Sequence, residues 1–249
     1  MTGAYDAARA FIDEIVHKAK TPDEKLNAYT HRIMCLTSET SEYGKALEIG
    51  FEILSKYGID IPLCPTKIMM AKEQMKYKLA LRNRSVSCLT TFPIKDDPLL
   101  ALCQQLNTCA TCKCIHSLFE LHTFLSLYDF NHILLPLCAD SGKLDVVKLL
   151  NWKIIQYSLK RGSISSNLVP IFARCAIVYA RVNDSKKCNE FAVTARALFP
   201  RIRDDKKNYV QSMVVLCNAM SLLQPFRSLT GPFLQSYKDC KVSGSCTFL

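Results

Sequence analysis

The stretch from residue 150 to residue 200 constrains the fold most, because it predicts a complete helical hairpin. In the first predicted arm, 165–182, apolar residues recur at steps of three and four, which places them on one helical face. Asn183-Asp184-Ser185 predicts a turn and a helix cap, and the second arm, 185–199, ends before Pro200. Neither arm can bury its apolar face alone, so each must pack on neighbouring elements. The two faces consist of Leu168, Phe172, Cys175, Tyr179 and Val182, and of Cys188, Ala192, Ala195 and Phe199.

A second hairpin is predicted near the start of the chain. One helix is expected over 1–20, and another follows Thr21-Pro22-Asp23, where proline suits a first helical turn. A third is expected over 43–57, with Gly58 just past its end. Its segment KALEIGFEILSKYGIDIP has the small-large-small spacing of a tetratricopeptide second helix. The aligned faces are Ala7, Phe11, Ile15 and Ala19 in the first helix, Leu26, Tyr29, Ile33, Leu36 and Thr40 in the second, and Ala46, Leu47, Gly50, Ile53 and Leu54 in the third.

The rest of the chain predicts further helices and a loop at 85–95. Residues 66–82 predict a helix on which Ile68, Met75 and Leu79 are in phase. Helices are also expected from Asp97-Pro98 to about Cys114, and over 117–139, 145–162 and 204–223. We therefore predict an all-α fold, an irregular tetratricopeptide-like α-solenoid of about ten helices. It would form a single array over residues 1–249, with about the last 25 residues weakly structured.

Four segments together resemble a known arrangement. They are YGIDIP after a helix, PIKDDPLLAL, the block 150–199, and FLQSYKDCKVSG. The arrangement, over roughly residues 25–245, is similar to the helical-repeat region of large multidomain signalling ATPases. The resemblance implies a helical scaffold and assigns no functional residue, because the chain contains none of the family's catalytic modules.

Positive charge is concentrated in residues 150–207, which hold twelve Lys and Arg against four Asp and Glu, or +8 of the net +10. Such a segment favours an acidic partner. The residues expected to bind it are Lys186, Lys187, Arg201, Arg203, Lys206 and Lys207. A solvated helical surface would give the same composition. Nucleic acid is the less favoured partner, because this segment lacks the interleaved aromatic residues that stack on bases.

Cysteine supplies two further candidate sites. Cys109, Cys112 and His116 could bind zinc from one helix, with Cys103 or His122 as a fourth ligand. The alternative is that they are small side chains inside a packed helix pair, since no second paired motif is present. At the other end of the sequence, Cys246-Thr247-Phe248-Leu249 matches a prenylation box, which in a chain with thirteen Cys also arises by chance.

Enzymatic activity is not expected. The sequence contains no GxxxxGK[ST], GxGxxG, HExxH or GxSxG motif, and it predicts neither a cofactor nor a transmembrane segment. Many cysteines without a secretory signal favour a reducing compartment, so we expect a cytoplasmic protein. The predicted function is a non-catalytic protein–protein interaction or regulatory scaffold, associated with a signalling ATPase. A nucleic-acid-binding helical repeat that uses the segment 150–207 is the alternative.

Overall fold

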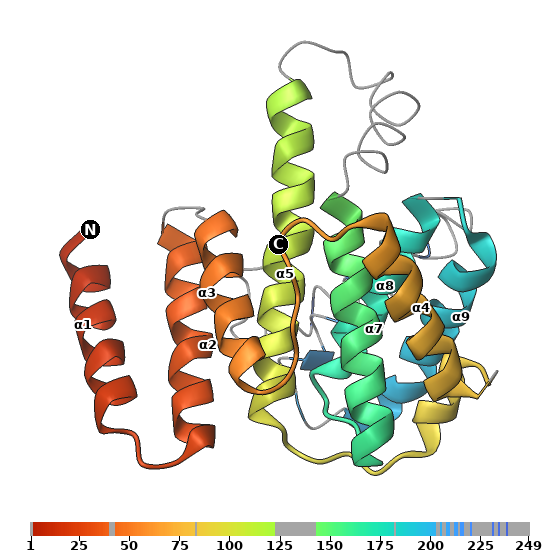
Figure 1. Cartoon of the computed structure of the whole chain (residues 1–249), viewed down its shortest axis with the longest axis horizontal. Helices are drawn as coiled ribbons and strands as arrows, with labels where there is room; N and C mark the ends of the chain where they lie inside the picture. Colours follow the sequence, from red (N-terminus) through yellow and green to blue (C-terminus); the bar gives the residue numbers. More distant parts are fainter. Residues whose placement is uncertain are drawn as a thin grey trace. The chain divides into compact units, whose positions relative to one another are not determined.

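The structure, a computed structural model, describes residues 2–39, 43–82, 84–122, 143–181 and 183–202, with scattered positions from 205 to 238. Within this part of the chain the regular secondary structure is helical, so the predicted all-α class is confirmed (Figure 1). The chain divides into two compact units, each made from two separate stretches of sequence. Unit 1 comprises Met1–Gln74 and Asp97–Ile154, and unit 2 comprises Met75–Asp96 and Ile155–Leu249.

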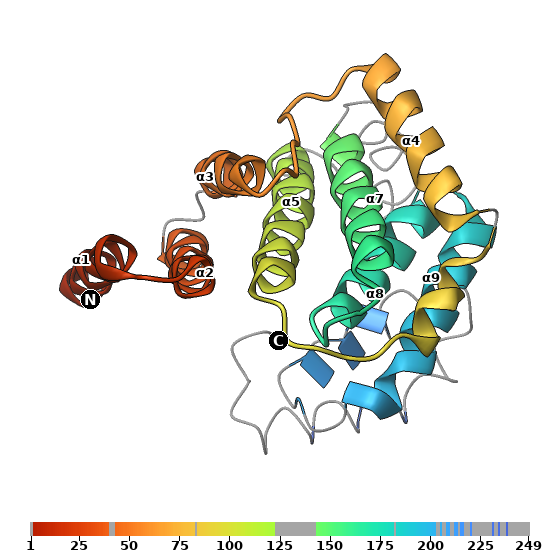
Figure 2. The same cartoon turned by 60° about the horizontal axis from the view of Figure 1, so that its bottom comes forward.

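In unit 1, helix α2 packs against α1, α3 and α5, and α3 also packs against α5 (Figures 1 and 2). A reciprocal capping box starts α2, because the Thr21 hydroxyl accepts from the Glu24 amide and the Glu24 carboxylate accepts from the Thr21 amide. At the start of α5, the Asp97 carboxylate accepts from the amides of Leu99 and Leu100 and so caps the helix. These helices span Thr2–Lys18 (α1), Pro22–Glu39 (α2), Tyr43–Lys56 (α3) and Pro98–His122 (α5).

The core of unit 1 confirms the predicted buried side of α3, all five residues of which are buried. Gly50 lets α3 approach α5 closely, since a Cβ at this position would lie 2.0 Å from the Leu106 Cδ2 atom. Gly58 ends the helix with a φ of +78°, a left-handed conformation that glycine adopts without steric cost. On the other side of α5, the Asn107 amide donates to the Asn151 carbonyl at 2.6 Å.

The prediction for α1 was wrong by one residue. Phe11 was placed on the aligned face, but it is 62% exposed, and the neighbouring Ile12 is buried instead. Apolar residues are adjacent at positions 11–12 and 15–16, so the helical period fits either phase equally well. Packing against α2 therefore selected which of the two faces became buried.

Unit 2 contains the predicted hairpin, formed by α8 (Leu168–Arg181) and α9 (Ser185–Leu198). The Phe191 ring stacks on Tyr179 at 5.4 Å between centroids and also contacts Phe172 at 5.9 Å. Asp184 caps α9 by accepting from the Lys187 amide at 3.0 Å. The predicted apolar faces are buried at every position that the structure describes, and Val182 lies outside the described residues.

Two boundaries differ from those predicted. The expected loop at 85–95 contains a 3₁₀ helix, η1 (Val86–Thr91), and continues into an isolated parallel bridge between Ile94 and Ile164. Helix α5 continues past Cys114 to His122, because no proline or glycine interrupts it there. The remainder of the helix predicted over 117–139 lies outside the described residues.

Helices α4 (Lys67–Leu81) and α7 (Lys143–Arg161) each contribute to both units. Gly162 follows α7 in a left-handed conformation, which agrees with the predicted end of this helix at Gly162. A short 3₁₀ helix, η3 (Phe199–Ile202), follows α9. The few described positions between 208 and 220 are helical, which agrees with the helix predicted for 204–223.

Candidate interaction surface

The three aligned apolar residues of α4 are exposed to solvent. Ile68 is 83% exposed, Met75 64% and Leu79 69%. They occupy positions i, i+7 and i+11 of one continuous helix, so they form a single stripe about 16 Å long. We call these three side chains the α4 apolar face. Single exposed apolar residues are common, but an aligned set of this kind often marks an interaction site.

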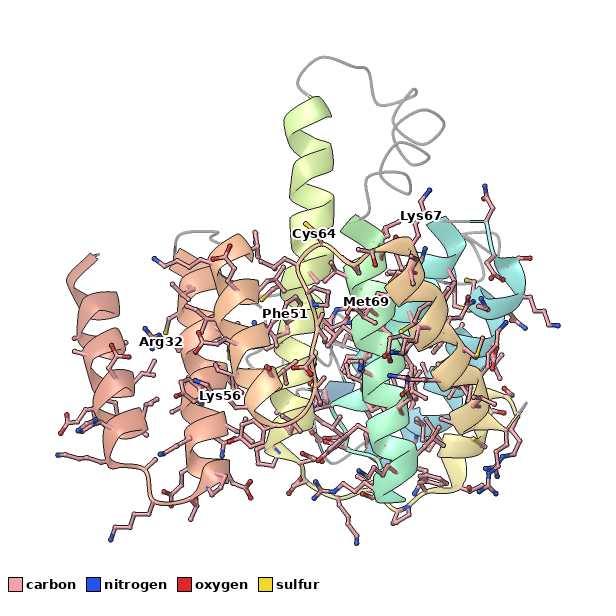
Figure 3. The ribbon with its side chains drawn as sticks, viewed as in Figure 1. Arg32, Phe51, Lys56, Cys64, Lys67 and Met69 are labelled. Atoms are coloured by element: carbon pink, nitrogen blue, oxygen red, sulfur yellow. The ribbon has the colours of Figure 1, made fainter. Side chains whose placement is uncertain are left out.

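Lysines flank the α4 apolar face on both sides. At about 100° per residue, Lys72 and Lys76 lie along one edge of the stripe, and Lys67 and Lys78 lie along the other. All four are exposed, and Figure 3 shows Lys67 and the neighbouring Met69 at the start of the helix. The face is therefore apolar along its centre and positively charged at its rims.

The opposite side of α4 anchors the helix. Glu73, the only acidic residue of α4, is buried and forms an ion pair with Lys153 at 3.2 Å within unit 1. Tyr77 is buried among residues of unit 2 that include Tyr179 and Glu190. Burial raises the pKa of the Tyr77 hydroxyl well above its usual value, because the ionised form would lose its hydration. Glu73 is therefore buried on the side of α4 that faces away from the apolar stripe.

The predicted basic partner site is divided by the structure. Lys186 and Lys187 lie in the first turn of α9, whereas Arg201 follows its end. A helix of this length spans about 21 Å, so Lys186 and Arg201 lie near opposite ends of α9. Lys186 is exposed, while Lys187 pairs with Asp184 at 3.3 Å and lies 5.1 Å from the centroid of the Tyr179 ring.

Arg201 has an intramolecular role. Its Nη1 donates to the Thr90 carbonyl, and its Nη2 donates to the Phe92 carbonyl at 2.7 Å. These bonds hold the end of η1 against η3, so the guanidinium already has partners inside the fold. Arg203, Lys206 and Lys207, which complete the predicted set, lie outside the described residues.

The cysteine candidates are only partly described. Cys109 is buried, and the side chains of Cys112 and His116 lie outside the described part of α5. Cys103, one of the two predicted fourth ligands, is buried, and desolvation raises the pKa of its thiol, which disfavours the thiolate that binds metal. The side chain of His122, the other, lies outside the described residues. Among the side chains that the structure describes, no group of three metal-binding residues comes together. Cys246 also lies outside the described residues.

The lysines of α4 are not among the predicted site residues, because most of the net charge lies in the longer segment 150–207. The signal was present in the helix KIMMAKEQMKYKLAL, which has four lysines and one acidic residue.

No helix among the described residues has the length and apolar character to cross a bilayer. No protein-family model, curated protein or solved structure matches the chain. The resemblance to signalling ATPases therefore stays a hypothesis based on the sequence segments that suggested it.

Proposed function

We propose that this chain is a non-catalytic scaffold that binds a protein partner, and that the partner presents an acidic amphipathic helix to the α4 apolar face. The observation that carries this proposal is the exposure of Ile68, Met75 and Leu79 on one helix. Burying apolar surface stabilises a complex by about 25 cal/mol per Å² before the costs of association. Three aligned anchors fit the spacing with which one amphipathic helix engages another surface.

The charge of the partner follows from the rims of the face. Lys67, Lys72 and Lys78 are exposed beside the apolar stripe, and the acid of α4 points to the other side. Acidic residues that flank the apolar stripe of a partner helix would meet these lysines. Complementary charge at a rim increases the association rate and excludes wrong partners more than it increases affinity.

We also propose that the helices α1, α2, α3 and α5 belong to an irregular tetratricopeptide-like solenoid of a cytoplasmic, signalling-ATPase-associated scaffold. Packing between helices that are near neighbours in sequence supports this interpretation, as does the tetratricopeptide spacing in α3. The nucleic-acid alternative has less support, because Arg201 and Lys187 have partners within the chain.

The test is a selection of helical peptides from a display library. Every peptide carries Leu at positions i, i+4 and i+7, and its flanking positions vary between Glu and Lys. We expect Glu-flanked peptides to be enriched. Their affinity should fall at least tenfold for the triple variant Ile68→Gln, Met75→Gln, Leu79→Gln, because interface anchors of this kind contribute about 1–2 kcal/mol each.

Two matched variants complete the design. Phe11→Gln with Val193→Gln removes exposed apolar side chains from α1 and α9, and it should leave peptide binding unchanged. Lys72→Glu with Lys78→Glu should weaken binding more at low salt than at high salt, because exposed charges are screened over about 8 Å at physiological ionic strength. Equal binding to the triple Gln variant, or enrichment of Lys-flanked peptides, would contradict the proposal. Binding to anionic lipid vesicles without peptide enrichment would contradict it too.

A further inference from the structure

Ser85 connects η1 to α9 through a single carboxylate oxygen. Its hydroxyl donates to the Glu190 Oε1 atom at 2.8 Å, and the Val86 amide donates to the same oxygen at 2.8 Å. The Ser85 hydroxyl also accepts from the Ser87 amide at 3.2 Å, which caps η1. We call these contacts the Glu190 latch.

The latch holds a part of the core in place. Val86 and Leu89, on the inner side of η1, are fully buried, and η1 packs against α9. The two ends of η1 are held differently, since Glu190 binds its start and Arg201 binds the carbonyls at its end. Opening the latch would therefore release the start of η1 while Arg201 still holds its end.

Ser85 itself is accessible. The residue is exposed, and its backbone is extended, with φ −69° and ψ 154°. Arg82 and Arg84, both exposed, lie three and one residues before it in a turn, in which Arg82 has a φ of +50° and the Arg84 amide donates to the Leu81 carbonyl. A protein kinase with an acidic substrate groove binds an extended segment in which arginines precede the acceptor hydroxyl, because its carboxylates pair with the guanidinium groups. The turn at Arg82 therefore opens when the kinase binds.

We infer that Ser85 is a phosphorylation site for a protein kinase that recognises the preceding arginines, and that its phosphorylation opens the Glu190 latch. In the transfer, the Ser85 Oγ attacks the γ-phosphorus of ATP, the bond from that phosphorus to the ADP oxygen breaks, and the hydroxyl proton passes to the kinase. The product carries a charge of about −1.5 to −2 at neutral pH.

The latch cannot survive this change in its original form. The hydroxyl that donated to Glu190 no longer exists, and a phosphate would lie beside a carboxylate. Like charges at this distance repel one another. Glu190 therefore turns away, and the Val86 amide loses the acceptor that protected it.

The experiment treats the full chain with ATP and the catalytic subunit of a cyclic-AMP-dependent protein kinase. Mass spectrometry then locates the phosphate, and hydrogen exchange reports on the Val86 amide. We expect phosphate on Ser85. The rate of hydrogen exchange at the Val86 amide should rise by a factor of about ten or more, because a hydrogen bond to a charged group is lost. Ser85→Ala should prevent the modification. Ser87→Ala is the matched control, because Ser87 is also exposed and follows Arg84 by three residues, and it should leave the modification unchanged.

A second variant tests the mechanism separately. In Glu190→Gln the side-chain carbonyl can still accept from Val86, but it carries no charge to oppose a phosphate. Phosphorylation of this variant should accelerate Val86 exchange much less than in the parent chain. The inference is overturned if the phosphate is found on Ser87, if Ser85 is not modified, or if Val86 exchange is unchanged after modification. An equal acceleration in Glu190→Gln would overturn the latch mechanism as well.

Discussion

Helices α3 and α4 follow one another in the chain and differ by one residue in length, yet they use their apolar residues in opposite ways. In α3 the aligned apolar residues are buried, and charged residues such as Glu48 and Glu52 face water. In α4 the aligned apolar residues are exposed, and the buried side includes Glu73 and Tyr77. Periodicity therefore indicates that residues share a face, but it does not show that the face is covered.

The contrast between the two helices comes from how apolar residues are distributed around each of them. In α3 one side of the helix is apolar and the other is polar, so only one orientation buries apolar surface without also burying charge. In α4 apolar residues occur all around the helix, including Met69, Met70 and Ala80, so more than one orientation is possible. The Glu73–Lys153 pair and the burial of Tyr77 then determine which side turns inward.

The largest effect is expected from one substitution made in both helices. Leu54→Ala, in α3, removes a fully buried side chain and should lower the free energy of unfolding by about 2–5 kcal/mol. Leu79→Ala, in α4, removes an exposed side chain and should change the free energy of unfolding by no more than about 0.5 kcal/mol. Urea unfolding of both variants measures the difference. Similar losses in the two variants would show that the α4 apolar face is covered in solution.

A smaller effect is expected at the closest approach of α3 to its neighbour. Gly50→Ala places a methyl group against the buried Leu106 side chain, and overpacking of this kind costs about 1–3 kcal/mol. Leu106→Ala creates the space that the methyl group needs. In the double variant the loss of stability should therefore be smaller than the sum of the two single losses. Strict additivity would mean that Gly50 does not contact Leu106.

The smallest effect concerns the buried side of α4 and depends on pH. Burial raises the pKa of Tyr77, so this hydroxyl ionises in the unfolded chain above about pH 10 while it stays neutral in the fold. The unfolded state then binds fewer protons than the native state, and stability falls as pH rises. The Tyr77→Phe variant has no hydroxyl to ionise at this position. Its free energy of unfolding, compared with that of the parent at the same pH, should therefore rise by about 1 kcal/mol between pH 8 and pH 11.

Denaturant unfolding at these two pH values tests this expectation. The difference between the variant and the parent isolates Tyr77, because other groups that ionise in the unfolded chain over this range, including the thiols of Cys103 and Cys175 that are buried in the fold, are common to both. A difference that does not change with pH would place Tyr77 on an exposed side and would reverse the assignment of the two faces of α4.

The helices themselves were predictable because their signals are local. The α8–α9 hairpin, the buried side of α3, and the glycines at 58 and 162 follow from helical spacing, caps and left-handed turns within a few residues. The concentration of lysine in α4 was also readable from the sequence. Misplaced features, such as the buried side of α1 and the end of α5, lie where apolar residues are adjacent or where no breaker occurs.

The tertiary structure alone decided how the candidate surfaces are used. Arg201 is predicted to bind a partner, and the structure shows that its guanidinium also bonds to carbonyls more than one hundred residues earlier in the chain. Glu190 reaches Ser85 over a similar separation. Helical period fixes the directions of side chains relative to one another, but which direction becomes buried depends on groups supplied by distant segments. For this reason the sequence determined the helices and their charge, whereas folding determined that the α4 apolar face remains exposed.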